Sequence, residues 1–259
     1  MFACCSSHTG SIQSADFNIL VCGTNTLCYN DAGCTVFEKQ VTLYMHYPDF
    51  KEIILGRRSV RKFTDQPVDM EDIKEIIDCA RYAPSDTNSQ TWEFIVILNK
   101  EKINEISEMT WEELHKIADG AKERGLEKEA RLLTRSFGPY ATAFTGAPAL
   151  IVCLAPPYTS KFREKIFDPI MISEPSFWDE EGIKSSCLAS QNLMLAAHAK
   201  GLATCAMTGP VLLAQHRMRE YLQISPEKQI NMVIALGHPS ETPPRLPRKP
   251  VEDILHIIE

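Results

Sequence analysis

The amino-acid sequence lacks the short motifs that mark the commonest enzyme folds. Its 259 residues contain no GxGxxG, no GxxxxGK(S/T), no GxSxG and no HExxH. Without these motifs, the dinucleotide-binding, P-loop, serine-hydrolase and zinc-protease interpretations lose their main support. Any functional signal has to lie in patterns that are spread more widely along the chain.

Membrane spans, excess basic charge and paired cysteines are also missing. The most apolar stretch, residues 147–157, is interrupted by prolines at both ends and is shorter than the roughly 18 residues that suggest a membrane span. The net charge of -7 opposes binding to nucleic acid or to an anionic membrane. The nine cysteines form no CxxC pair, so reduced thiols without a metal are the simpler interpretation. We expect a soluble, cytoplasmic protein with no nucleic-acid and no membrane partner.

Residues 1–44 differ from the rest of the chain. They hold five of the nine cysteines and a single lysine, Lys39, and they show no sustained helical or alternating pattern. They also lack the basic and apolar regions of a secretory or mitochondrial leader. A more ordinary globular sequence begins at Met45. We therefore predict that residues 1–44 are a disordered, dispensable extension or a non-native start, and that residues 45–259 form one working domain.

Helical and strand patterns are mixed through residues 45–259. Helices are expected at residues 47–56, 69–82, 100–135, 185–201, 210–222 and 251–259, and strands at residues 91–98, 147–155, 202–207 and 230–237. Residues 185–201 are apolar around most of the helix, which predicts a helix buried on nearly all sides, in the centre of a domain or in a dimer interface. Residues 156–182 are rich in proline and aromatic residues and are expected to be irregular, as in a lid. Because the order is not a strict βαβ alternation, the pattern predicts an α+β fold.

Two short basic segments stand out in this acidic chain. They are RRSVRKF at residues 57–63 and RLPRKP at residues 245–250. Arginine and serine side chains of this kind can make several charge-assisted hydrogen bonds to one phosphate. Each segment taken alone is equally compatible with a solvated basic surface. Together with a polar loop between them, they favour a ligand that carries a phosphate.

The polar loop is PSDTNSQ at residues 84–90. Its Asn and Gln amides offer both hydrogen-bond donors and acceptors, which the pyrimidine edge and ribityl hydroxyls of a flavin require. The loop is also compatible with a simple turn between a helix and a strand, because its residues are common turn formers.

In combination, these motifs resemble those of the FMN-dependent nitroreductase family. The matching stretches are RRSVRKF, ARYAPSDTNSQTWEFIVI, SQNLMLAAHAKGLATC and ALGHPSETPPRLPRKPVEDIL, in the same order and at similar separations over about residues 46–259. The resemblance implies an α+β fold with a central mixed, mostly antiparallel sheet flanked by helices. It also implies an intertwined homodimer with FMN at the interface between the subunits.

The resemblance further implies which residues hold FMN. The phosphate and ribityl chain would be held by Arg57, Arg58, Ser59 and Arg248, with Arg245 as a weaker candidate. Arg61 would reach the pyrimidine edge of the flavin, and backbone N–H groups at Thr208 and Gly209 would face flavin N5. The partner subunit would supply Pro84, Ser85 and Asn88, with Gln90 beside them.

Two positions depart from the pattern of the family. Thr91 stands where relatives commonly have proline, which is expected to change the stiffness of the loop more than its chemistry. Thr208 lies near a position where many relatives carry an acidic residue, so the contact to N5 would rest on the backbone alone. Residues 100–182, which cover the flavin in this family, match nothing that names a substrate.

The implied reaction is the transfer of hydride from NADH or NADPH to FMN, followed by reduction of a small-molecule electron acceptor. Nitroaromatic compounds and quinones are the expected acceptors, and no catalytic residue beyond the flavin is required. Other activities of the family, such as reductive dehalogenation or fragmentation of the flavin, stay open. A non-catalytic module that stores or senses FMN stays open as well, and so does a thiol or metal protein that uses the N-terminal cysteines.

Overall fold

The computed structural model describes residues 11–14, 17–22, 25–30, 33–35, 46–171 and 175–259. The chain divides into two compact units, Met1–Asp49 and Phe50–Glu259, and each unit is described by itself. Among the described residues, no helix is both long enough and apolar enough to cross a membrane.

The first unit contains a four-stranded antiparallel sheet in the order β1-β2-β3-β4. Its strands are β1 (Ser11–Ser14), β2 (Phe17–Cys22), β3 (Asn25–Asn30) and β4 (Gly33–Thr35). The sequence pattern did not predict these strands, although the apolar run ILVC within β2 is a strand signal that was available. That residues 1–44 are a dispensable, disordered or non-native extension stays a prediction, and much of this segment lies outside the described residues.

The second unit is built around a four-stranded sheet in the order β5-β6-β8-β7. The strands are β5 (Glu93–Ile97), β6 (Ala149–Ala155), β7 (Ala203–Met207) and β8 (Gln229–Gly237). Each neighbouring pair of these strands is antiparallel, and a parallel bridge between Ser59 and Thr204 adds the mixed character. All seven residues of β6 are buried, as its continuous apolar run predicts.

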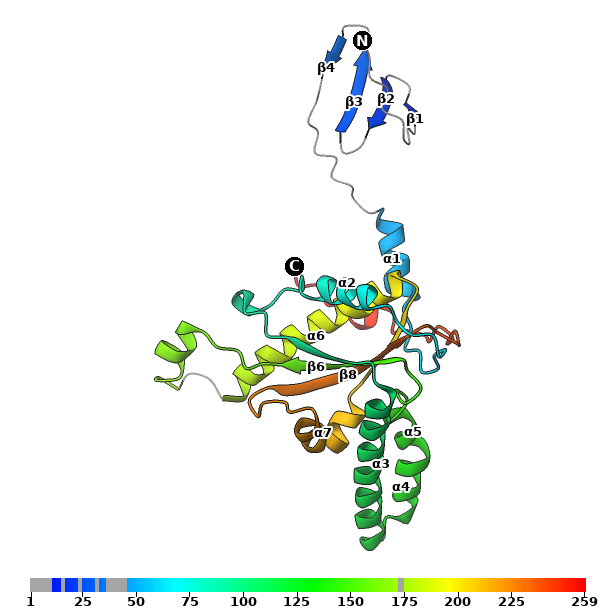
Figure 1. Cartoon of the computed structure of the whole chain (residues 1–259). Coiled ribbons are helices and arrows are strands. Elements are labelled where there is room, and N and C mark those ends of the chain that lie inside the picture. Colours follow the sequence, from blue (N-terminus) through cyan, green and yellow to red (C-terminus); the bar gives the residue numbers. More distant parts are fainter. Residues whose placement is uncertain (1–10, 15–16, 23–24, 31–32, 36–45, 172–174) are drawn as a thin grey trace. The chain divides into compact units, whose positions relative to one another are not determined.

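Helices cover both faces of this sheet (Figure 1). The covering helices are α2 (Met70–Ala80) and α6 (Pro175–Ala199) on one face and α3 (Lys100–Glu123) and α7 (Gly209–Tyr221) on the other. The remaining helices are α1 (Tyr47–Gly56), α4 (Glu127–Leu132) and α5 (Gly138–Ala141). Side chains alternate along β6, so Leu150 and Val152 pack with α3 and α7, while Ile151 and Cys153 pack with α2 and α6. This arrangement confirms the predicted α+β fold.

The helix ends follow from local sequence. Asp69 caps α2, and its side chain accepts a hydrogen bond from the N–H of Glu71 at 2.8 Å, as the sequence predicts. The region expected to be helical at residues 100–135 is divided between α3 and α4. Gly125 lies at this division with a φ of +73°, a conformation that glycine adopts without strain.

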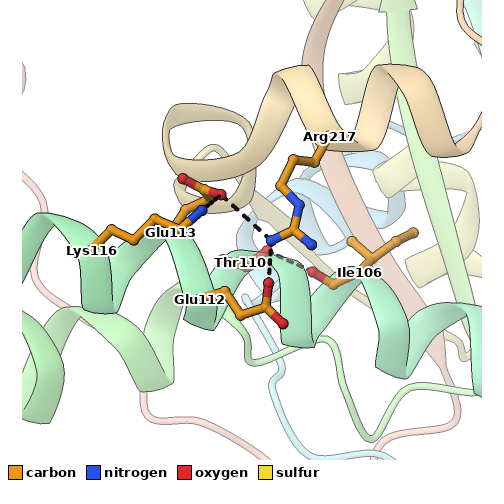
Figure 2. A network of polar contacts seen from close by, with 6 residues as sticks. All are labelled: Ile106, Thr110, Glu112, Glu113, Lys116 and Arg217. Carbon is orange, nitrogen blue, oxygen red and sulfur yellow. Dashed lines mark hydrogen bonds and ion pairs between the residues drawn. The ribbon is translucent and has the colours of Figure 1, made fainter.

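Polar contacts fix α7 against α3 (Figure 2). Arg217 on α7 pairs with Glu112 on α3, and its Nη1 lies 3.5 Å from Oε1 of Glu113. Lys116 donates a hydrogen bond to Glu113 at 2.8 Å, and this bond holds the pKa of the Glu113 carboxyl below its usual range. The position of α7 matters because its first residues belong to the candidate site described below.

Two expectations about the helices were wrong. Helix α6 begins at Pro175, ten residues before the predicted start, because proline is tolerated in a first helical turn and because Trp178 stacks on Tyr158 and Phe167. In the single chain, Leu188 on the same helix is 46% exposed, so burial of this helix on nearly all sides would require the partner subunit and stays a prediction. The predicted helix at residues 251–259 is only a 3₁₀ turn, Val251–Asp253, because its residues are exposed and so short a helix needs packing to be stable.

The segment between β6 and α6 is also less irregular than expected. A π-helical turn, η3 (Arg163–Phe167), precedes α6. The Arg163 guanidinium lies 5.5 Å from the centre of the Trp178 ring and 3.4 Å from the Asp168 carboxylate. An aromatic and cationic cluster therefore organises this segment, which the composition of the segment alone did not predict.

Candidate functional site

The first basic segment lies along the β7 edge of the sheet. The N–H of Val60 donates to the carbonyl oxygen of Thr204 on β7 at 3.1 Å. On its other side, the N–H of Thr64 donates to the carbonyl of His238, and the carbonyl of Lys62 accepts from the N–H of Ser240. Backbone hydrogen bonds thus hold the segment between β7 and residues 238–240, and they fix the positions of the Cα atoms of its arginines.

Three guanidinium groups from this region lie near one another. Arg57 is half-buried, and its pKa is lowered first by burial and then by the positive charges of Arg58 and Arg248. Among the ion pairs formed by described residues, none includes Arg57, Arg58 or Arg248. A group of like charges without a carboxylate partner creates a positive potential that favours an anion.

Arg58 differs from Arg57 in its local contacts. Its Nη1 donates to the carbonyl oxygens of Leu55 at 2.6 Å, Gly56 at 3.2 Å and Arg57 at 2.8 Å. These are carbonyls at the C-terminal end of α1, where acceptors lack helical partners and the helix dipole favours a cation. Arg58 therefore caps α1, a role that the sequence analysis did not distinguish from anion binding.

A cavity of about 180 Å³ opens beside these arginines. Its lining residues are Gly56, Arg57, Arg58, Val60, His198, Gly201, Leu202, Ala203, Thr204, Pro239, Glu241, Thr242 and Pro243. Thr204 is 1% exposed, and its Oγ1 is buried without a hydrogen-bond partner. A buried hydroxyl without a partner is uncommon in folded proteins.

His198 also lines the cavity. No hydrogen bond from its ring is formed to another described residue, and the ring packs against Gly56. A Cβ atom at residue 56 would lie only 2.7 Å from Nε2 of His198. Burial, and then the charges of Arg57 and Arg58, lower the pKa of His198. No sequence signal pointed to this residue, because α1 and α6 are far apart in the chain.

The predicted flavin-ring residues lie at the same edge of the sheet. The guanidinium of Arg61 lies over the ring of Tyr140, 5.0 Å from its centre. Thr208 and Gly209 stand at the N-terminus of α7, where backbone N–H groups lack helical partners and face outward as donors. Gly209 packs tightly on α5, since a Cβ atom there would lie 2.8 Å from Cβ of Ala141.

The loop at residues 84–90 lies at the opposite edge of the sheet. It leads into β5, and β6 and β8 separate β5 from β7. Three strand spacings amount to about 14 Å before any side chain is counted. Figure 1 shows the chain after α1 and the turn between α2 and β5 on opposite sides of the sheet. One chain therefore brings together Arg57, Arg58, Ser59, Arg61, Thr208, Gly209 and Arg248, but not Pro84, Ser85, Asn88 and Gln90.

The backbone of this loop is strained. Thr87, Asn88 and Gln90 all have positive φ angles, of 46°, 57° and 52°. Two hydrogen bonds hold the shape, one from the N–H of Gln90 to Oγ of Ser85 at 3.0 Å and one of 3.2 Å between the hydroxyls of Thr87 and Tyr158. Non-glycine residues in this conformation persist only where surrounding contacts impose it, and they are concentrated at functional sites.

Comparison with known proteins identifies the family. The sequence profile described as "Nitroreductase family" matches residues 54–238 of this chain. The chain belongs to the nitroreductase family. The predicted resemblance is therefore confirmed, and nitroreductase-family proteins are flavin-dependent oxidoreductases, so this chain is an oxidoreductase of that general kind.

Individual relatives and structures agree with this assignment. The "Putative NADH dehydrogenase/NAD(P)H nitroreductase" of Methanothermobacter thermautotrophicus is 32% identical over 75% of this chain and 80% of its own length. An iodotyrosine deiodinase of Nematostella vectensis is 27% identical over 80% of this chain and 74% of its own length. A BluB-like flavoprotein from Clostridium difficile 630 has the same fold, with a TM-score of 0.70, 24% identity, and coverage of 83% of this chain and all of that chain.

The described part of the chain contains no cluster of side chains suited to a metal ion. No group of three or more His, Cys, Asp and Glu side chains is arranged to bind a metal ion there. The side chains of the cysteines in residues 1–44 lie outside the described part, so the alternative of a thiol or metal protein stays untested.

Proposed function

We propose that this protein is a homodimeric NAD(P)H-dependent FMN oxidoreductase that reduces a nitroaromatic, quinone or related acceptor. The observation that carries the proposal is that the guanidinium groups of Arg57, Arg58 and Arg248 lie near one another beside a cavity. The family assignment supports the flavin, and this group of residues supports a phosphate at its end.

The donors present fit a phosphate group. A phosphate dianion accepts short, charge-assisted hydrogen bonds from arginine, and partial burial strengthens them. A bound dianion would relieve the repulsion that lowers the pKa of Arg57, because it supplies the missing negative charge. Gly56 and Gly201 keep the wall of the cavity free of side-chain bulk.

The complete site requires a second copy of the chain. Arg57 and Asn88 belong to opposite edges of the sheet, so one flavin contacts both only if the partner subunit supplies the loop at residues 84–90. The protomer exposes apolar side chains that a partner would cover, among them Leu188 on α6 and Ile257 and Ile258 near the C-terminus, the last of them 97% exposed.

FMN, when bound, supplies the redox chemistry by taking hydride from NADH or NADPH and passing two electrons to the acceptor. The chain itself supplies position and charge. Tyr140 holds the Arg61 guanidinium, which would place fixed positive charge at the pyrimidine edge. The N-terminus of α7 would direct backbone N–H groups at N5 from Thr208 and Gly209. Glu241 holds the backbone of Arg61, whose N–H donates to Oε1 at 3.2 Å.

The visible absorption spectrum of the purified protein tests the cofactor. We expect a flavin spectrum as purified or after incubation with FMN, bleaching by NADH or NADPH, and recovery when an acceptor such as p-benzoquinone is added. A protein that binds no flavin under these conditions contradicts the proposal. A bound flavin that neither nicotinamide bleaches supports a storage or sensor module instead.

Reductive dehalogenation is a second candidate function. The observation in its favour is the similarity to the iodotyrosine deiodinase of Nematostella vectensis, which extends over 80% of this chain. Measuring iodide release from 3-iodotyrosine by the reduced protein separates the two activities. Iodide release faster than nitro-group reduction under the same conditions would favour the dehalogenase.

A further inference from the structure

A pair of hollows lies next to the residues assigned to the flavin ring. The π-helical turn η2 (Leu133–Phe137) joins α4 to α5. Tyr140 on α5 holds Arg61, and Ala141 and Phe137 are the closest neighbours of the Cβ position of Gly209, at 2.8 Å and 3.5 Å. This short stretch of chain therefore contacts both the residue assigned to the pyrimidine edge and the residue assigned to N5.

The first hollow is mainly apolar. It has a volume of about 490 Å³ and is lined by Glu129, Leu132, Leu133, Ser136, Phe137 and Tyr140. The spacing of these residues, three or four apart, places them on one face of the continuous helical segment. Leu132 is 65% exposed and Tyr140 is 60% exposed, so apolar surface faces the hollow. The volume is in the range of small-molecule sites, which is roughly 300–1,000 Å³.

The second hollow adjoins the first and is basic. It has a volume of about 360 Å³, and its lining adds Lys128, Arg131 and Arg135 to the shared residues Glu129 and Leu132. Among the ion pairs of described residues, none involves these three cations. Arg135 belongs to η2, the same short segment that supplies Leu133, Ser136 and Phe137 to the first hollow.

We propose that these paired hollows bind the electron acceptor, and that they select an aromatic acceptor that carries a carboxylate or another acidic group. The proposal deepens the proposed function and rests on it. The aromatic ring packs against Phe137 and Tyr140, beside Gly209, and the acidic group pairs with Arg135 and Arg131. Planar guanidinium groups suit this role because they bind a carboxylate through two parallel hydrogen bonds. Glu129 is the one acidic residue of the lining and repels a carboxylate placed away from the arginines.

Binding measured without a nicotinamide tests this selectivity directly. The probes are 4-nitrobenzoate and the neutral 4-nitrobenzyl alcohol, titrated by calorimetry into the oxidised protein after incubation with FMN. We expect the carboxylate to bind about tenfold tighter than the alcohol, and this preference to disappear in the double variant Arg131→Gln/Arg135→Gln. Arg124→Gln removes the same charge from the same pair of helices outside both hollows, and it is the matched control that keeps the preference.

Turnover gives a second readout. In the double variant, kcat/KM for 4-nitrobenzoate falls about tenfold, mainly through KM, while kcat/KM for p-benzoquinone is unchanged. Equal affinity of the two probes in the unmodified protein overturns the proposal. A double variant that keeps the preference for the carboxylate also overturns the proposal. This result is expected if the partner subunit covers the hollows. A flavin that is absent or inert to NAD(P)H refutes the proposed function instead, and the calorimetric comparison distinguishes that failure from a failure of acceptor selectivity.

Discussion

Replacing Arg57 with alanine is expected to weaken FMN binding without weakening the fold. The side chain is half-buried and forms no ion pair with a described residue, so its charge is available to a ligand phosphate. Loss of a hydrogen bond to a charged group removes about 1.5–3 kcal/mol, which corresponds to about a 10- to 100-fold rise in Kd. Arg248 is exposed, and Arg248→Ala is expected at the lower end of that range.

The mutual repulsion of the arginines refines this expectation. Burial, and then the positive charges of Arg58 and Arg248, lower the pKa of Arg57, so the flavin-free protein holds this charge in place at a cost. Arg57→Ala removes that cost, so the free energy of unfolding of the flavin-free protein should stay equal or rise slightly. In a double-mutant cycle, Arg57 and Arg248 are expected to show coupling, because in the proposed site both would contact one phosphate and each affects the charge of the other.

Quenching of flavin fluorescence provides the assay. FMN and riboflavin are titrated into the flavin-free protein, its Arg57→Ala variant and the control variant Arg124→Ala. Riboflavin has no phosphate, so its Kd should be the same in all three proteins. If Arg57→Ala weakened riboflavin binding as much as FMN binding, the assignment of Arg57 to the phosphate would be refuted.

Two further predictions concern residues that the sequence did not single out. The pKa of His198 is lowered in the folded chain. As the pH falls below about 6.5, the unfolded chain therefore takes up a proton at this residue more readily than the folded chain. The free energy of unfolding decreases as a result. His198→Gln should therefore flatten the fall in urea-unfolding free energy between pH 7 and pH 5, and an unchanged slope would contradict the assigned environment. Gly209→Ala would place a Cβ atom 2.8 Å from Cβ of Ala141 and 3.1 Å from its Cα, and it should lower the free energy of unfolding by about 1–3 kcal/mol. Gly120→Ala is its control, because nothing lies within 4 Å of the added atom, and it should raise the melting temperature. A Gly209→Ala protein as stable as the unmodified chain would show that α5 does not pack on α7 as described.

The fold was predictable wherever the signal was local. The Asp69 cap predicted the start of α2, and the continuous apolar run of β6 predicted a buried strand. The early start of α6 was missed because it depends on Trp178 packing against residues before it in the chain, which no helical period reveals. The helix predicted at the C-terminus does not form. Its apolar residues are exposed in the protomer, so no tertiary packing stabilises the helical pattern that the sequence shows.

The candidate site was predictable as a set of segments but not as an arrangement. The charges of Arg57, Arg58 and Arg248 are visible in the sequence, yet the capping contacts of Arg58 and the convergence of Arg57 with Arg248 appear only in three dimensions. Thr204 and His198 carry no motif, and their importance comes from the cavity that they share. Likewise, the contact of Tyr140 with Arg61 joins two segments that are far apart in the sequence.

The arginines of the candidate site and the loop at residues 84–90 lie on opposite edges of one sheet. This separation affects what happens when two different variant chains are present together, as in a heterozygote. In the proposed dimer, each flavin would take its arginines from one chain and its loop from the other. A chain defective at Arg57 and a chain defective at Asn88 would each form inactive pairs with themselves. Paired with one another, they would leave one flavin position with both defects and the other with none. Two broken copies would then restore one working centre, so damage to this protein would be partly rescued by a different damage in its neighbour.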